Sequence, residues 1–523
     1  MELLRALLGA AGSRLSSSRE SASESLFGAA RFLAQVLEPL PPGFPPGPCG
    51  DSGLELAADP LTFLERSQRQ HGGMVGLRLA GARCVLVSDA TVAAQVLVED
   101  AASFTKKGTA FFPGSQLVGQ GLLVSDGALW QRQRRLAAPA FRAAAVAAYA
   151  TAMGTAAVSL TAPGGAWWSV ESTAAHCRDV YPDFNDLTLQ IVARALFGAD
   201  VRGAAAREVN SAIAEAFGFF ARRAAQPPLP EWLPTRDNVR FGAAVARLDA
   251  AVFGLIAQRR RAHASLPSAP EPNDLLDRLL LSVDDAGAGM SDTALRDELM
   301  TLLVAGQETS AILLTWCCAM LAQHPAVAAR VAAEADEVLG PDRAPDASHF
   351  SKLHQATAVV LETMRLLPPA YLVGRCAARD LQLGGYSVPQ GTTLLVSPYL
   401  LHRCTALWPD AASFTPQRWL DEAGEAHAVD AMKGMGVHGA YIPFGAGPRN
   451  CVGAGFAMME AVLVLSALCR AVTLRVPTGE QPPQTAALIT LRPQAARLQI
   501  TPREAGGSEK AAQNASDAVS VAR

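Results

Sequence analysis

Residues 441–457 decide how this chain is interpreted, and they read YIPFGAGPRNCVGAGFA. One cysteine, Cys451, lies in a glycine-rich loop, and a helix-like apolar run follows directly. Glycines permit tight bends and let a flat ligand approach the backbone, and this loop carries Gly445, Gly447 and Gly453. A thiolate here can accept hydrogen bonds from turn amides, and the start of the helix adds positive potential. These conditions suit a sulfur that binds iron.

The composition excludes several classes of protein. Of 523 residues, 50% are apolar and 18% are charged, so the chain can bury a large core. The formal net charge is -3, which gives no support for nucleic-acid binding. The nine cysteines are scattered and form no CxxC pair. This pattern indicates a reduced intracellular compartment rather than a disulfide framework.

The chain divides into four predicted parts. Residues 1–39 form a leader that is rich in serine and arginine but also carries glutamates. Both an organelle transit peptide and a loosely associated helical leader stay open, so a plastid is one candidate location. Residues 40–50 (LPPGFPPGPCG) form a proline-rich hinge, residues 51–503 the globular domain, and residues 504–523 a tail with the composition of disordered segments. No uninterrupted apolar run reaches the about 18 residues of a membrane span.

The spacing of apolar residues predicts a mainly α protein with a small β-rich lobe. Alternation over residues 75–87 predicts a hairpin. Residues 89–340 have mostly helical spacing interrupted by prolines. Short strands are expected around residues 375–396, and weaker alternation recurs at residues 474–476 and 498–500.

A long central helix is predicted over residues 292–323, with Ser291 as its N-terminal cap. Gly306, Glu308 and Thr309 interrupt an otherwise apolar sequence. An exposed polar face on a surface helix is one explanation. The apolar flanks favour a buried helix instead, and buried polar side chains need a specific role.

The cysteine loop resembles the ligand loop of the cytochrome P450 haem-thiolate monooxygenases. A buried free cysteine in a glycine-rich turn is the alternative. The resemblance implies the P450 fold, with haem b held between the long helix and the loop and with the Cys451 thiolate as the axial iron ligand. The matching loop residues, which would also contact the haem, are Phe444, Gly445, Gly447, Arg449, Cys451 and Gly453.

The central helix resembles the oxygen-activating helix of the same family. The resemblance implies that Gly306 leaves room for dioxygen. Glu308 and Thr309 would supply protons through water so that the O–O bond splits, and the cysteine thiolate favours the same cleavage.

Two further groups match the family. Glu362 and Arg365 share one helix face, which alone fits an ordinary surface ion pair. With Arg418 in FTPQRW, they resemble the family's buried structural network.

Trp130 and Arg134 lie four apart in LWQRQRRL and resemble the pair that binds a haem propionate. Both offer only donors, which suits a carboxylate. Arg375 and Arg449 are the matching later donors.

The remaining arginines of this segment, Arg132, Arg135 and Arg142, form either a solvated basic face or a docking surface for an acidic redox protein. The chain has no flavin or ferredoxin module, so the expected electron donor is a separate ferredoxin or flavoprotein reductase. His402 is interpreted as structural and not as a second iron ligand, because dioxygen needs an open position. Gln307, where many relatives have histidine, and Cys404-Thr405, in place of Asp-Pro, are mild departures from the family.

The expected reaction is insertion of one oxygen atom from dioxygen into a C–H bond of an apolar molecule. The central helix resembles that of plastid carotenoid-ring hydroxylases, while residues 230–249 and 384–403 resemble bacterial enzymes acting on fatty acids or terpenoids. A carotenoid or other isoprenoid is therefore the first choice and a fatty acid the alternative. Phe217, Phe219 and Phe220 indicate either an apolar ligand or ordinary core packing.

Two other classes stay open. A haem-thiolate isomerase or dehydratase uses a hydroperoxide and no reductase, but such relatives usually lose the acid–threonine pair, which is intact here as Glu308-Thr309. A non-catalytic haem protein would not need these residues. The expected location is intracellular, either soluble or at most peripheral to a membrane.

Overall fold

The computed structural model covers most of the chain. It describes residues 40–109, 116–165, 167, 176–198, 203–223, 233–265, 274–283, 287–340 and 344–503. The leader expected over residues 1–39 and the tail expected over residues 504–523 lie outside the described residues.

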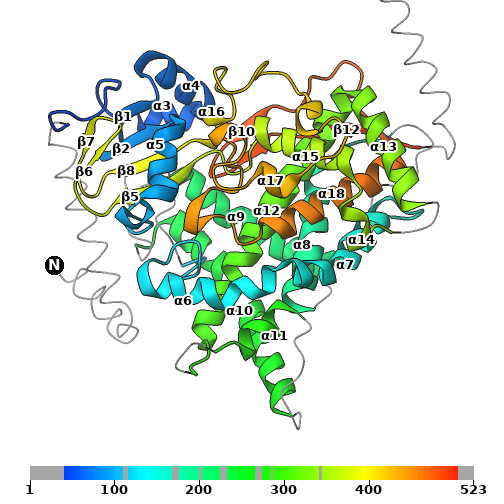
Figure 1. The fold of residues 1–523 in the computed structure, drawn as a ribbon. Coiled ribbons are helices and arrows are strands. Elements are labelled where there is room, and N and C mark those ends of the chain that lie inside the picture. The colour runs from blue at the N-terminus through cyan, green and yellow to red at the C-terminus, as the bar shows by residue number, and fades with distance from the viewer. Residues whose placement is uncertain are drawn as a thin grey trace, which may run out of the picture.

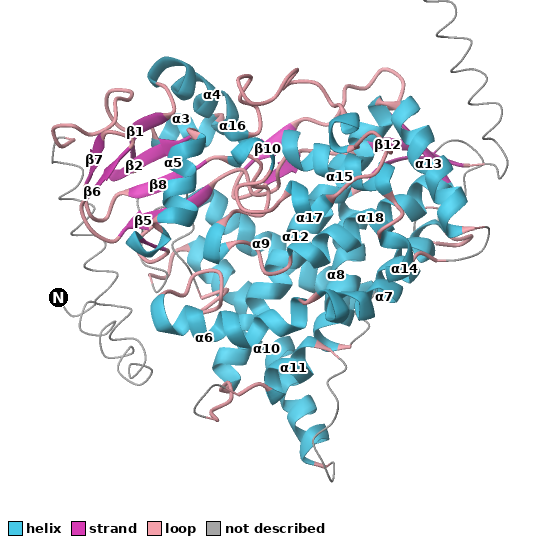
Figure 2. Cartoon of the chain, in the orientation of Figure 1, coloured by secondary structure: helices cyan, strands magenta, loops and turns pink. Residues whose placement is uncertain are grey.

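Helices make up most of the described chain (Figure 2). They are α3 (Gly53–Ala58), α4 (Pro60–His71), α5 (Ala90–Ala94), α6 (Gly127–Ala137), α7 (Ala143–Thr161), α8 (Tyr181–Phe197), α9 (Gly203–Arg223), α10 (Arg236–Ala264), α11 (Leu275–Leu281), α12 (Asp292–Gln323), α13 (Pro325–Leu339), α14 (Ala347–Phe350), α15 (His354–Leu366), α16 (Pro398–Leu401), α17 (Ala428–Ala431) and α18 (Ala454–Ala471). The predicted mainly α architecture is confirmed.

The strands are short, and the principal sheet lies in a lobe at the opposite end of the molecule from α13 and α14 (Figure 1). The strands are β1 (Met74–Leu79), β2 (Ala82–Val87), β3 (Phe104–Thr105), β4 (His176–Asp179), β5 (Val373–Ala377), β6 (Leu381–Leu383), β7 (Tyr386–Val388), β8 (Thr393–Val396), β9 (Val472–Arg475), β10 (Thr485–Ala487), β11 (Leu491–Pro493) and β12 (Arg497–Pro502). The order of the principal sheet is β1-β2-β8-β5-β3.

The predicted hairpin is the start of this sheet. Strands β1 and β2 are antiparallel, with Met74 opposite Val87. Their two-residue turn has positive φ at both Ala80 (47°) and Gly81 (83°), the geometry that matches strand twist in tight hairpins. Strand β8 then joins β2 in parallel, so sequence from the C-terminal third completes a sheet begun near residue 74.

The proline-rich segment over residues 40–50 forms no helix or strand, as predicted. It is attached to the β lobe by hydrogen bonds. The N–H of Gly76 donates to Pro46 O at 2.8 Å, and the N–H of Ser387 donates to Gly43 O at 2.8 Å. These contacts fix the segment along the edge of β1 and beside β7.

The long helix α12 crosses the helical part of the molecule. The Ser291 hydroxyl accepts the N–H of Ala294 at 3.2 Å and caps its start, as predicted. Its 32 residues span about 48 Å, and Pro325 follows its end. Helices α8 and α18 pack against it. Almost every side chain from Leu295 onward is buried, which excludes an exposed polar face.

Three described helices are long and apolar enough to cross a membrane by length and composition. They are α7, α12 and α18. Helix α7 was not expected among them, and its 19 residues contain no charge. All three contribute side chains to one apolar core inside the protein. Their apolar character is therefore used for packing in this fold.

Candidate active site

The cysteine loop is a tight turn stabilised by its glycines. The N–H of Cys451 donates to Phe444 O at 2.9 Å and closes the loop. Gly445 and Gly447 both have φ of 70°. A Cβ on Gly447 would lie 1.9 Å from Leu97 O, so only glycine fits this position. Gly453 has a negative φ of -88° and does not need this freedom, and it caps α18.

The environment of Cys451 combines accessibility with desolvation. Its side chain has accessible surface, yet burial by the surrounding protein raises the pKa of its thiol. The sulfur can be both accessible and desolvated if it lines a hollow within the protein. A hydrogen bond from the Gly453 amide and the charge of Arg134 oppose the increase and favour the thiolate. A metal cation bound to the sulfur would complete the deprotonation.

One strip of α12 faces the interior without being buried. From Leu295 to Ala319, the residues that keep accessible surface are Ala305, Gly306 and Thr309. Their i, i+1, i+4 spacing puts them on one face of the helix. Because the flanking turns are buried, this strip is a break in the buried surface of the helix. The structure thus places two of the predicted residues, Gly306 and Thr309, at this break.

The cysteine loop and this part of α12 adjoin a common apolar cluster. Val452, next to Cys451, packs against the cluster that contains Val304 of α12 and Val192 of α8. A Cβ on Gly306 would lie 3.0 Å from Val192 Cγ2, a very tight contact. Gly306 therefore has a packing reason as well as the predicted role of leaving room for dioxygen.

The predicted acid and alcohol differ in their surroundings. Glu308 is only 5% exposed, and burial raises the pKa of its carboxyl. Its Oε1 accepts a hydrogen bond from the Tyr181 hydroxyl at 2.9 Å. The Thr309 hydroxyl donates to Ala305 O at 2.6 Å, and its oxygen can still accept a hydrogen bond. The two residues can therefore hold and pass a proton beside the accessible strip.

The predicted propionate-binding residues gather beside the cysteine loop. The Arg449 guanidinium lies 4.6 Å from the centre of the Trp130 ring. Arg134 donates to the main-chain O and side-chain Oδ1 of Asn450 at 2.9 and 2.8 Å. Arg375 is 4% exposed, and burial together with the charge of Arg449 lowers its pKa to about 10.

Sequence reasoning missed Lys106 and Asp126 in this group. Burial and the charges of Arg375 and Arg449 lower the pKa of Lys106 to about 7. Asp126 accepts from Arg449 at 2.5 Å and from the Lys106 N–H at 2.8 Å. Asp126 is thus one carboxylate among several cations, which repel one another. A ligand with two carboxylates would relieve this repulsion. The residues therefore fit a haem. A lysine pair directly after β3 was the only sequence signal.

The three residues of the predicted structural network lie together in one buried unit. Glu362 and Arg365 are both 0% exposed. All five N–H groups of Arg365 are used: two bonds to Glu362 at 2.9 Å, and three bonds to the main-chain oxygens of His402, Ala411 and Ser413 at 2.7–2.9 Å. Arg418 adds a bond to Glu362 at 3.1 Å.

The other sequence predictions have mixed outcomes. His402 is fully buried, and its Nε2 accepts the N–H of Ile442 at 2.9 Å. Burial lowers its pKa to about 3, so it is neutral and structural, as predicted.

Phe219 stacks on Phe241 with ring centres 4.2 Å apart, which favours core packing for this aromatic group. Arg132 donates to carbonyls of residues 288 and 289, whereas Arg142 is exposed.

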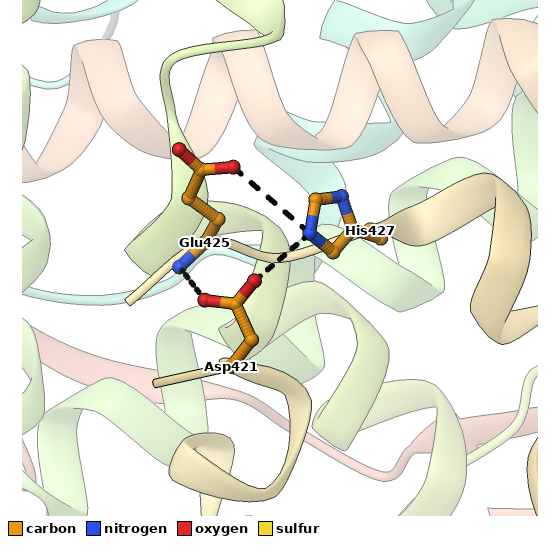
Figure 3. Close-up of side chains that lie close together, drawn as sticks. All are labelled: Asp421, Glu425 and His427. Carbon is orange, nitrogen blue, oxygen red and sulfur yellow. Dashed lines mark hydrogen bonds and ion pairs between the residues drawn. The ribbon is translucent and has the colours of Figure 1, made fainter. Parts of the chain in front are cut away.

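A separate cluster of possible metal ligands lies on the surface, in the turn after Trp419 (Figure 3). Asp421 Oδ2 lies 3.1 Å and Glu425 Oε2 4.0 Å from Nε2 of His427. Asp421 Oδ1 also accepts the N–H groups of Ala423 and Glu425 at 2.9 Å. All three side chains are exposed and are explained by hydrogen bonding within the turn.

Comparisons with known proteins agree with this geometry. The Cytochrome P450 family model matches residues 41–500. The cyclooctat-9-en-7-ol 5-monooxygenase of Streptomyces melanosporofaciens is 33% identical over 86% of this chain and 93% of its own length. The chloroplastic protein LUTEIN DEFICIENT 5 of Arabidopsis thaliana is 30% identical over 79% of this chain and 69% of its own length.

A solved structure supports the fold. The crystal structure of the cytochrome P450DA heme domain superposes with a TM-score of 0.75 at 25% identity, covering 88% of this chain and 97% of that one. The cofactor is haem with a cysteine thiolate ligand, and the reaction needs a small-molecule substrate, dioxygen and a redox partner. The match over almost the whole described chain, together with a loop and helix built to hold haem, makes this protein a member of the cytochrome P450 family and a monooxygenase.

Proposed function

We propose that this chain hydroxylates an apolar isoprenoid, with Cys451 as the iron ligand and Glu308 and Thr309 as the proton supply. The observation that carries the proposal is the accessible strip of Ala305, Gly306 and Thr309 within an otherwise buried α12. A strip of two small residues and one hydroxyl admits a small reactant and gives it one polar contact. The apolar cluster beside it suits a substrate without charge.

The roles of the residues follow from their positions. Haem bound through a thiolate supplies oxygen activation. Cys451 would hold its iron, while Trp130, Arg134, Arg375 and Arg449 would bind the propionates. Lys106 is added to this set because its charge interacts with those of Arg375 and Arg449.

Protons would come from the other side, through α12. Glu308 is a buried carboxyl, and because burial raises its pKa it holds its proton to a higher pH than an exposed glutamate does. The Thr309 hydroxyl would orient a water beside the reacting oxygen, so that each proton moves by a short step. Glu308 and Thr309 are consecutive residues of one helical turn, which keeps the positions of the carboxyl and the hydroxyl fixed relative to each other.

Relatives support the substrate class. The Streptomyces protein is named for oxygenation of cyclooctat-9-en-7-ol, and the Arabidopsis protein is named for lutein deficiency. We propose a carotenoid or other isoprenoid as substrate, and a separate ferredoxin or flavoprotein reductase as electron donor. We also propose an intracellular location, soluble or peripheral to a membrane, with a plastid left open.

Two measurements test the proposal. Cys451→Ser should lose the thiolate-type spectrum of the reduced carbon-monoxide complex and all oxygenation, and retention of both would refute the ligand assignment. For substrate, carotenoids, cyclic terpenoids and long-chain fatty acids are compared by the Soret shift and by product formed with dioxygen and a reductase. Shifts and product with fatty acids alone would refute the isoprenoid assignment. Product with an organic hydroperoxide but never with dioxygen would favour an isomerase.

A further inference from the structure

A polar stripe on α8 faces the reactive turn of α12. Tyr181, Asn185 and Thr188 follow an i, i+4, i+7 spacing and share one helix face. The Thr188 hydroxyl donates to Gln307 O at 2.9 Å. The Gln307 side-chain amide donates to Asn185 Oδ1 at 2.6 Å, and the Tyr181 hydroxyl donates to Glu308 Oε1 at 2.9 Å. The stripe thus fixes two consecutive residues of α12.

Glu308 is held from two sides. Tyr181 at the start of α8 provides one contact, and the turn between β10 and β11 provides the other through the Thr490 side chain, while Arg492 of β11 adds its charge. This turn is itself anchored to α12, because the indole N–H of Trp316 donates to Leu491 O at 2.9 Å. Removal of the Tyr181 hydroxyl would leave the carboxyl held only from the hairpin side.

The Tyr181 hydroxyl is suited to this contact. Asn185 donates to Tyr181 O at 3.1 Å and fixes the first turn of α8. Burial, followed by the nearby charge of Glu308, raises the pKa of the Tyr181 phenol, so the group stays protonated and acts as a donor. A donor to a carboxylate favours its ionised form, which opposes the effect of burial on Glu308.

We propose that Tyr181 is the positioning residue for Glu308: its hydroxyl holds the carboxyl between α8 and the β10–β11 turn and keeps its proton releasable for the oxygenation reaction. The proposal rests on the role of Glu308 in the proposed function. Tyr181 exchanges no electrons and forms no covalent bond in this role. It sets where the carboxyl lies and how readily the carboxyl gives up a proton, which is then replaced from solvent.

The test compares Tyr181→Phe with a matched control, Tyr399→Phe. Tyr399 is buried whereas Tyr181 is half-buried, and Tyr399 also donates to a glutamate, Glu65, at 2.7 Å, but in the β lobe. Both variants should keep wild-type haem content, carbon-monoxide spectrum and substrate-induced Soret shift. In Tyr181→Phe alone, product formed per reductant consumed should fall roughly threefold to tenfold, the factor expected from one hydrogen bond. The difference should appear as released peroxide.

A second readout requires no turnover. The carboxyl C=O infrared band that disappears in Glu308→Gln reports protonated Glu308. Because the lost hydrogen bond favoured the ionised form, this band should persist to higher pH in Tyr181→Phe than in the wild type. The alkaline limb of the product-yield profile should move the same way. Arg492, the charged residue that acts on Glu308 from β11, is the same in the wild type and in Tyr181→Phe.

A double variant separates positioning from folding. In a Glu308→Gln background, Tyr181→Phe should cause no further loss of product yield. An equal loss in that background, or a Tyr181→Phe protein with wild-type yield and an unshifted infrared titration, would overturn the proposal. If the wild type forms no product with any reductase, the proposed function fails, while the infrared titration still decides whether Tyr181 controls the Glu308 carboxyl.

Discussion

Two buried glutamates, Glu362 and Glu308, show how the same side chain serves two purposes in this protein. Glu362 accepts five hydrogen bonds, from the guanidinium groups of Arg365 and Arg418, the amide of Thr415 and the indole of Trp419. Glu308 has hydroxyl partners and one cation acting from a distance. A carboxylate whose lone pairs are all occupied by strong donors is fixed in place, which suits structure. A carboxyl with weaker partners can change its protonation, which suits chemistry.

The largest effect is expected from a substitution in the buried network around Glu362, the structural glutamate. Arg365→Ala would leave Glu362 buried beside unpaired carbonyls, a loss on the order of 3–5 kcal/mol in the free energy of unfolding. The variant should fail to retain haem. Haem content per folded protein measures this directly.

The matched control for that variant is Arg247→Ala, which breaks a surface ion pair with Glu208 at 3.0 Å. It should change the free energy of unfolding by no more than about 1 kcal/mol. Equal haem content in Arg365→Ala and Arg247→Ala would mean that the buried network does not support the haem site.

A third buried glutamate makes the stability of the protein depend on pH. Glu460 of α18 is buried, and its Oε2 accepts the Ser310 hydroxyl at 2.5 Å. Burial raises its pKa to about 8. Because the folded pKa lies above the unfolded one, the stabilising contribution is full at low pH and is lost as pH rises from about 4.5 through about 8.

Glu460→Gln should therefore be more stable than the wild type at about pH 9, by a difference on the order of a few kcal/mol, and similar at about pH 5. Thermal midpoints at both pH values measure this. Glu298, whose pKa burial raises to about 7, would keep part of the pH slope in the variant. A wild-type slope in Glu460→Gln would assign the whole dependence to other groups.

The sequence predicted whatever depends on local patterns. The cysteine loop and the Glu362–Arg365 pair are each formed by residues close together in the sequence, and the resemblance to a known family suggested their roles. Helix α12 was predicted from its apolar spacing and its cap. The charge interaction of Lys106 with Arg375 and the hydrogen bond of Tyr181 with Glu308 join distant segments, the latter 127 residues apart. Only packing brings them together. The i, i+4, i+7 polar stripe on α8 was visible in the sequence, but its partner helix was not.

The role of Gly306 also shows this limit. The resemblance of its helix to the oxygen-activating helix of the family implied that it leaves room for dioxygen. The structure adds Val192 of α8 as a tight neighbour. No local pattern predicts which helix approaches a glycine, because the approach depends on the crossing of two elements.

The smallest effect on the fold is expected from a substitution of Thr309, the neighbour of the chemical glutamate Glu308. Only the reaction should change in this variant. Within the part of the chain that the structure describes, the Thr309 hydroxyl bonds only to Ala305 O of its own helix, so Thr309→Ala removes no tertiary hydrogen bond there. Thermal midpoint, haem content and the substrate-induced Soret shift should stay at wild-type values. Product per reductant consumed should fall about tenfold, with peroxide released instead, because positioned proton transfer contributes factors of this size or more. Thr315→Ala, which removes the same i−4 bond one and a half turns further along α12, is the control. Wild-type coupling in Thr309→Ala would remove this hydroxyl from the reaction, and equal uncoupling in Thr315→Ala would assign the effect to the helix rather than to the accessible strip.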